Sequence, residues 1–376
     1  MNKFILILLL SVTIISCSSG SKNSGSGSES PGEKFNLTDF YSNKAALKTK
    51  VESVFNQLSE RQKVAQMIVQ AAGKLGKPDK EIDRLIQARA IGGVLLLNGS
   101  MDGFTNKVDH FDSLADKSDL LPLIYSADAE PSLIYRKIEG STSVPKTNEL
   151  KTIEENKHTA NVISQDLKKI GILYNYAPVL DLSPNNEAIK NRSYSSSPDS
   201  VIELAGAFAS ELQRNGIAAT AKHFPGHGLV KGDTHSKLVF IDGDMKEVDV
   251  YKPFIRDGIV SVMVGHIAVR NNERYDTDGL PASCSKKIVT GLLRNELGFQ
   301  GIITTDAMNM GALKEIPNVD FLAVQAGVDM VLMPGDEEML IAQILNRIEK
   351  DDDFRLQIYD SVKRIIRLKI CLGIIN

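Results

Sequence analysis

Short apolar runs alternate with longer amphipathic segments from about Leu58 to the end of the chain. The runs are mostly continuous stretches of β-branched residues and leucine, a pattern typical of parallel strands that are covered on both faces. Eight runs predict strands: Met67–Ala71, Gly93–Leu97, Pro122–Ser126, Leu173–Asp181, Ala218–Lys222, Ser261–Gly265, Gly301–Thr305 and Asp329–Met333.

The segments between these runs predict helices, because their apolar residues recur at helical spacing. Ser59 and Gln62 form an S-x-x-Q capping box, and Gly216 stands where a glycine ends a helix. Eight strands alternating with helices predict an α/β fold, most economically a single (β/α)8 TIM-type barrel. The alternative is an open doubly wound sheet, but the chain has no G-x-G-x-x-G after a strand. The predicted helices include Thr159–Ile170, Ser200–Asn215, Ser285–Glu296, Met310–Ala326 and a C-terminal Phe354–Lys369.

The composition is that of an ordinary globular protein. Of 376 residues, 42% are hydrophobic and 24% are charged, with a net charge of −3. This apolar content argues against a disordered chain, and the missing basic excess argues against a dedicated nucleic-acid binder. The cysteines are too few and too scattered for a disulfide framework, so we expect Cys284 and Cys371 to be buried apolar fillers.

The N-terminus predicts export and a lipid anchor. The apolar run from Phe4 to Ile15 is shorter than the roughly 20 residues that span a bilayer, but it suits a signal peptide. Its end, Ile14-Ile15-Ser16-Cys17, resembles the lipobox of bacterial lipoproteins. We therefore expect a signal peptide over residues 1–16, lipidation at Cys17, a Ser/Gly-rich tether over residues 17–36 and the barrel over 37–376. The predicted location is the cell envelope, on the periplasmic side or the cell surface, with the membrane and leaflet left open.

Barrel enzymes carry their chemistry where the strands end, and the most conspicuous strand end here is rich in histidine. Lys222-His223-Phe224-Pro225-Gly226-His227-Gly228 is followed, after four residues, by Asp233-Thr234-His235. Two interpretations compete. A metal ion could be bound by His223, His227, Asp233 and His235. Alternatively, the Asp233 carboxylate could orient the His235 imidazole and stabilise its protonated form for proton transfer.

Other predicted strands also end in polar side chains. Asp306 follows Gly301–Thr305 and is a candidate nucleophile, the alternative being a cap of the next helix. Asp128 follows the third strand, with Arg136 eight residues further on, and Arg192 follows the fourth. Acidic, basic and imidazole groups gathered in this way indicate a ligand rich in hydroxyl groups, such as a sugar.

At this point the motifs resemble glycoside hydrolase family 3, and within it the β-N-acetylglucosaminidase branch. The residues that carry the resemblance are KHFPGHG-x4-D-[ST]-H over 222–235, APVLD over 177–181, NRSY over 191–194, MVGHI over 263–267 and TDAMNM over 305–310. They cover roughly residues 55 to 370 in the family's order.

The resemblance implies a barrel enzyme that removes terminal β-linked N-acetylhexosamine with retention, in two steps. Asp306 matches the nucleophile, and His235, held by Asp233, matches the general acid/base. The positions that hold the sugar in this branch are matched by Asp128, Arg136, Arg192, Lys222 and His223, although Lys222 could instead serve as an ion-pair partner of Asp128 or Asp306. The resemblance calls for no metal and no cofactor.

Two segments depart from the family's pattern. Where the family often has D-x-E-G-G-R-V, this chain has Pro131, Ser132 and Leu133 in place of the glycine pair and the arginine, and Leu229 stands where the branch often has Asp. We therefore expect activity with an altered substrate fit. The remaining alternatives are a β-N-acetylhexosaminide phosphorylase and a sugar-binding lipoprotein without catalysis. The expected partner is an oligosaccharide from peptidoglycan, chitin or host glycans, and the expected state is a monomer.

Overall fold

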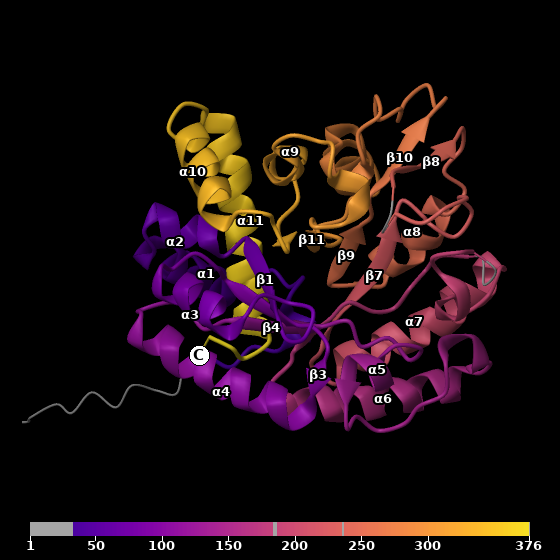
Figure 1. The fold of residues 1–376 in the computed structure, drawn as a ribbon, viewed down its shortest axis with the longest axis horizontal. Coiled ribbons are helices and arrows are strands. Elements are labelled where there is room, and N and C mark those ends of the chain that lie inside the picture. Colours follow the sequence, from indigo (N-terminus) through magenta and orange to yellow (C-terminus); the bar gives the residue numbers. More distant parts are fainter. Residues whose placement is uncertain (1–32, 183–185, 235–236, 376) are drawn as a thin grey trace, which may run out of the picture. The chain divides into compact units, whose positions relative to one another are not determined.

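The computed structural model describes residues 33–182, 186–234 and 237–375, and these form an eight-stranded parallel barrel surrounded by helices (Figure 1). All eight predicted strands are present; seven have bounds within two residues of those expected, whereas the run Leu173–Asp181 contains only the two-residue strand β6. Their bounds are β1 Ile68–Ala72, β2 Gly93–Leu96, β4 Ile124–Ala127, β6 Tyr174–Asn175, β7 Ala218–Phe224, β9 Ser261–Val264, β11 Ile302–Thr305 and β12 Val331–Leu332.

The strands neighbour one another in the order β11-β9-β7-β6-β4-β2-β1-β12, and every pair is parallel. A bridge between Thr304 and Met330 joins the two ends of this order and closes the barrel. Each barrel strand is buried along its whole length, because side chains fill the barrel on one face and helices cover the other. The prediction of a single α/β barrel is confirmed.

Helices cover the outside of the barrel, and short 3-10 turns occur in several of the connecting segments. Among the described residues, no helix is both long and apolar enough to cross a membrane. The helices are α1 Ala45–Gln57, α2 Glu60–Ala65, α3 Asp79–Gln87, α4 Met101–Lys117, α5 Ile134–Lys137, α6 Ile153–Ile170, α7 Pro198–Arg214, α8 Val248–Arg256, the π-helix η5 Lys287–Glu296, α9 Val319–Ala326, α10 Glu337–Ile348 and α11 Asp352–Cys371. The 3-10 turns are η1 Leu37–Asp39, η2 Thr147–Glu149, η3 Lys190–Arg192, η4 Ala282–Cys284 and η6 Gly311–Leu313.

One predicted helix is wrong in its first half. Residues 310–318 form the turn η6 and irregular structure, and α9 begins only at Val319. Pro317 lacks the backbone donor that a helix interior needs, and Asn318 adopts a left-handed conformation with φ of 53°. The segment directly after β11 is therefore a loop.

Two small parallel ladders outside the barrel were not expected from the sequence. Strand β8 (Val239–Asp242) pairs with β10 (Ile267–Arg270), and β3 (Gly99–Ser100) pairs with β5 (Ile138–Glu139). Strand β7 also runs further than predicted, so Lys222, His223 and Phe224 belong to the strand and not to the loop that follows it. The first residues of the histidine-rich motif therefore stand on the rigid part of the barrel.

The C-terminal helix seals the end of the barrel where the strands begin. Lys369 is fully buried, and its amine donates to Gln66 Oε1 (2.6 Å), to the Gly92 carbonyl (2.9 Å) and to the Pro122 carbonyl (2.7 Å). These acceptors stand just before β1, β2 and β4. One side chain of α11 thus ties three strand beginnings together.

The described chain also starts at this end of the barrel. Arg367 of α11 donates to the carbonyls of Asp39, Phe40 and Ser42, and the Tyr41 hydroxyl donates to the Ile259 carbonyl at 2.6 Å. Ile259 lies two residues before β9. The segment around η1 is therefore fixed to the face opposite the strand ends.

Candidate active site

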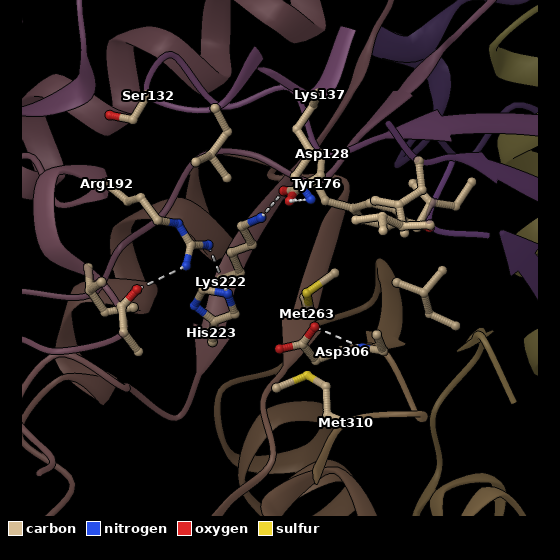
Figure 2. Close-up of a pocket in the computed structure, with 18 of the residues that line it drawn as sticks. Asp128, Ser132, Lys137, Tyr176, Arg192, Lys222, His223, Met263, Asp306 and Met310 are labelled. Carbon is tan, nitrogen blue, oxygen red and sulfur yellow. Dashed lines mark hydrogen bonds and ion pairs between the residues drawn. The ribbon is translucent and has the colours of Figure 1, made fainter. Parts of the chain in front are cut away.

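A cavity of about 560 Å³ opens where the barrel strands end, a volume usual for a small-molecule site (Figure 2). Charged side chains from several strand ends reach into it: Asp128, Lys137, Arg192, Lys222, His223 and Asp306. Four of these come from the five residues predicted to hold the sugar. The apolar part of the wall includes Tyr176, Met263 and Met310, which Figure 2 shows among the charged groups.

Lys222 on β7 links two carboxylates that follow β4. Its ammonium lies 2.5 Å from Asp128 Oδ1 and 2.6 Å from Glu130 Oε1, and the lysine and Glu130 are buried. Lys137 approaches the other oxygen of Asp128 at 3.4 Å. The ion-pair role considered for Lys222 is therefore present. It leaves a third ammonium hydrogen beyond these two contacts, so Lys222 can also donate to a ligand.

Arg192 joins this network through Glu130. Its guanidinium makes two contacts with that carboxylate, from Nε to Oε2 at 2.8 Å and from Nη2 to Oε1 at 2.7 Å. The same Nη2 lies 3.4 Å from His223 Nε2. Such a bidentate pair fixes the plane of the guanidinium, so its position is set before any ligand binds.

Asp181 orients His223 from behind the pocket. Its Oδ2 lies 2.7 Å from His223 Nδ1, and its Oδ1 accepts the backbone N–H of His227 at 2.7 Å. Because a carboxylate can only accept here, Nδ1 carries the proton and Nε2 faces the pocket. Burial alone would raise the pKa of Asp181, but the His223 imidazole and the His227 amide hold that pKa below its usual range.

The same balance keeps the mouth of the barrel charged. Burial opposes ionisation of Asp128, yet Lys222, Lys137 and Arg192 bring the pKa of its carboxyl well below the usual value. Burial likewise opposes the charge on Lys222, and Asp128 and Glu130 raise the pKa of its ammonium above the usual value. The network therefore stays ionised at neutral pH and presents strong donors and acceptors.

Asp306 stands directly after β11 and faces the pocket beside Met263 (Figure 2). Its Oδ1 accepts the N–H of Ala307 at 2.8 Å. Burial would raise the pKa of Asp306, but the nearby imidazoles of His223 and His266 and the Ala307 amide hold it below its usual range. Since the following segment is a loop, Asp306 does not cap a helix. It is an ionised carboxylate at a strand end, as a nucleophile must be.

The predicted Asp233–His235 dyad is described only in part. Asp233 and Thr234 belong to the described residues, whereas His235 lies outside them. Thr234 is buried, its hydroxyl contacts His227 Nε2 at 3.2 Å, and its carbonyl accepts the N–H of Ala312 at 3.2 Å. Ala312 lies in the loop that follows Asp306. The segment between the two dyad residues is thus fixed to the loop of the predicted nucleophile.

Arg136 and Lys137 occupy different places. Arg136 is exposed at the rim of the cavity, while its neighbour Lys137 forms the ion pair with Asp128. The buried Ile134 and Ile138 fix the single turn of α5, which directs Arg136 outward.

The loop that departs from the family pattern is well anchored. The Ser132 hydroxyl donates to the Asn191 carbonyl at 2.7 Å and lies 3.0 Å from the Thr147 hydroxyl. Leu133 is buried and lines the cavity. An apolar wall therefore stands where the family pattern has an arginine.

Three charged residues of the network were not predicted as site residues: Glu130, Lys137 and Asp181. Asp181 ends a predicted strand, so the rule that found Asp306 could also have found it. Glu130 and Lys137 carry no such signal, because only the fold shows which cations they meet. The metal interpretation involved His235, which is outside the described residues; within them, no cluster of three His, Cys, Asp or Glu side chains is suited to a metal ion.

Comparison with known proteins points to one family. Residues 59–368 match the Glycosyl hydrolase family 3 N terminal domain. Beta-hexosaminidase A of Pseudoalteromonas piscicida is 29% identical over 331 residues, which make up 77% of this chain and 55% of that protein. The Beta-hexosaminidase of Neisseria meningitidis serogroup A is 30% identical over 310 residues, or 76% of this chain and 80% of that protein.

A solved structure agrees with this comparison. The glycoside hydrolase family 3 β-N-acetylglucosaminidase of Paenibacillus sp. str. FPU-7 superposes with a TM-score of 0.76 at 28% identity, and the match covers 84% of this chain and 63% of that one. The chain thus spans little more than half of the first relative and under two thirds of this solved structure.

Proposed function

Because the chain belongs to glycosyl hydrolase family 3, we propose that it is a retaining exo-β-N-acetylhexosaminidase that releases terminal β-linked N-acetylglucosamine. The observation that carries the proposal is the ionised Asp306 at the end of β11, facing a cavity lined by fixed hydrogen-bonding charges. The β-hexosaminidase names of the relatives support a hexosaminide as the substrate, and the name of the Paenibacillus structure supports N-acetylglucosamine. The natural glycan would be a peptidoglycan fragment, a chitooligosaccharide or a host glycan.

In the first step, the Asp306 carboxylate attacks the anomeric carbon of the sugar. The bond from that carbon to the leaving oxygen breaks, and His235 gives its proton to that oxygen. In the second step, His235 takes a proton from water, the water oxygen attacks the same carbon, and the bond to Asp306 breaks. Two displacements at one carbon retain the β configuration.

The described residues support a binding role for the pocket. A sugar hydroxyl both donates and accepts, and the cavity offers the spare ammonium hydrogen of Lys222 and the lone pairs of Asp128. Their ion pairs hold these groups in place before the ligand arrives, which lowers the ordering cost of binding.

The contacts of Thr234 support the Asp233–His235 dyad in addition to the spacing of the motif. Thr234 stands between Asp233 and His235; its carbonyl is bonded to Ala312 in the loop that follows Asp306, and its hydroxyl contacts His227. Imidazole has an ordinary pKa of about 6.5, so it can give a proton in one step and take one in the next near neutral pH.

The test is an assay of the full chain, purified in detergent, on 4-nitrophenyl β-N-acetylglucosaminide with and without EDTA and phosphate. We expect release of free N-acetylglucosamine that neither additive changes, and we expect Asp306→Ala to abolish it while the protein stays folded. Release of sugar 1-phosphate would identify a phosphorylase. Activity that EDTA abolishes would identify a metal enzyme, and sugar binding without turnover would identify a binding protein.

We also propose that Cys17 carries a lipid that holds the protein at the cell envelope. The apolar run before Cys17 and the Ser/Gly-rich stretch after it support this proposal from the sequence. Metabolic labelling with a radioactive fatty acid should mark the wild type and not Cys17→Ser, and unlabelled wild type would refute the anchor.

A further inference from the structure

A buried glutamate stands beneath the turn that leads to the predicted dyad. Glu247 immediately precedes α8, which lies beside β7 (Figure 1), and only 3% of its surface is exposed. Its Oε1 accepts the N–H of Leu182 at 2.8 Å and that of Gly228 at 3.2 Å, and its Oε2 accepts the N–H of Leu229 at 3.1 Å. One carboxylate therefore accepts hydrogen bonds from backbone amides of the loop after β6 and of the loop after β7.

The turn at Gly226 packs directly against the side chain of Glu247. Gly226 has a φ of +129°, and a Cβ added there would lie 2.4 Å from the Cβ of Glu247 and 2.6 Å from its Oε2. A residue with a side chain would both strain the backbone and displace the glutamate. The close approach of turn and carboxylate is thus a requirement of this geometry.

The contacts of Glu247 continue toward the dyad. His227 lies between Gly226 and Gly228, and its Nε2 contacts the hydroxyl of Thr234, the residue after Asp233. A displaced turn would therefore move His227, and His227 would no longer hold Thr234 in place. The position of Asp233 depends on the start of its loop being fixed.

We propose that Glu247, in its ionised form, is a positioning residue for the acid/base loop: its carboxylate fixes the 226–229 turn and thereby sets the position of Asp233. The inference rests on the proposed function for its catalytic meaning. No part of the family resemblance involved Glu247, which acts through the loop and not on the substrate.

Protonation would weaken this anchor. A carboxylate accepts at both oxygens, whereas a protonated carboxyl gives up acceptor sites and gains a hydroxyl that finds only N–H donors here. Asp181 faces Glu247 from the loop after β6, and Tyr251 faces it from α8. Within the described residues, no cation forms an ion pair with Glu247. Burial, with Asp181 adding to it, raises the pKa of Glu247 to about 7.

The variant Glu247→Gln tests the proposal, because glutamine keeps the size of the side chain and imitates its uncharged form. At about pH 5.5 the wild type is itself mostly protonated, so we expect the two kcat/KM values to agree within about twofold. At about pH 8.5 the wild type should exceed the variant by at least about tenfold, as expected when a catalytic group is misplaced. The control is Asp249→Asn, which removes an exposed carboxylate from the same helix.

A ratio that stays constant across this pH range would overturn the proposal, since a merely structural loss would not titrate. Hydrogen exchange supplies a second measurement that does not depend on turnover. Peptides covering residues 182 and 226–230 should exchange faster in Glu247→Gln than in the wild type at about pH 8.5. Equal exchange would refute the anchor. If the wild type had no glycosidase activity, the proposed function would be refuted. The hydrogen-exchange result would then still test whether Glu247 fixes the 226–229 turn.

Discussion

Asp181 Oδ2 lies 2.7 Å from His223 Nδ1, and this contact directs the other ring nitrogen of His223 into the pocket. An asparagine at position 181 would present an amide group that can donate to Nδ1 and stabilise the opposite tautomer. We expect Asp181→Asn to lower kcat/KM by about 10–100-fold with little change in the melting temperature. Unchanged kcat/KM would show that the tautomer of His223 does not matter.

Removal of His235 should affect substrates according to their leaving groups. An acid donates its proton to the leaving oxygen, so a leaving group that is stable as an anion needs it least. We expect His235→Ala to reduce hydrolysis of N-acetylglucosamine disaccharides far more than hydrolysis of 4-nitrophenyl N-acetylglucosaminide. The ratio of the two kcat/KM values, in variant and wild type, measures the effect. Equal losses on both substrates would contradict an acid role.

Two neighbouring cations on α5 should behave differently. Lys137 pairs with Asp128 at 3.4 Å, whereas Arg136 is exposed at the rim. Loss of Lys137 frees Asp128 to move, so Lys137→Met should lower kcat/KM by about tenfold. Arg136→Met serves as the matched variant and should have a smaller effect. The opposite ranking would mean that Arg136 folds inward to bind the substrate.

Lys369 should make stability depend on pH. Burial lowers the pKa of its amine from 10.5 to about 7. Between these two values the unfolded chain binds more protons than the folded one, so this residue adds stability as the pH rises, by up to about 1.4 kcal/mol per pH unit. Below about pH 7 both states hold the proton and the slope vanishes.

Urea unfolding of Lys369→Met measures this effect against Lys363→Met, a variant of a partly exposed lysine of the same helix that pairs with Glu52 of α1. The substitution leaves Gln66 and two carbonyls without their donor, at a cost of about 2–4 kcal/mol. We expect the deficit relative to wild type to be larger at about pH 9 than at about pH 6. A deficit that is the same at both pH values would show that the folded protein does not release the proton of the buried amine in this range.

The barrel could be predicted because its strands are continuous apolar runs; only the run Leu173–Asp181 was predicted much too long, since β6 ends at Asn175. The failure over Met310–Ala326 came from apolar spacing that continued through Pro317, where the backbone lacks a donor. The β8–β10 ladder was missed because short strands at a barrel rim have weak patterns and depend on a partner elsewhere in the chain.

The site was predicted unevenly for a similar reason. Strand ends and the family motif indicated Asp128, Lys222, His223 and Asp306, and all four line one cavity. Glu247 escaped because it precedes a helix in a stretch without a motif, and its role lies in the three amides that the fold brings to it. The sequence shows which side chains could act on a substrate. Only the contacts in the folded protein show which side chains hold those residues in position.

The contacts of residues 39–42 with Arg367 and Ile259 fix this segment to one end of the barrel. The described chain begins at the closed end of the barrel, and the cavity opens at the other end. Because this segment and the cavity lie at opposite ends of the barrel, a substitution within residues 39–42 would act through the stability of the fold and not through contact with a bound ligand.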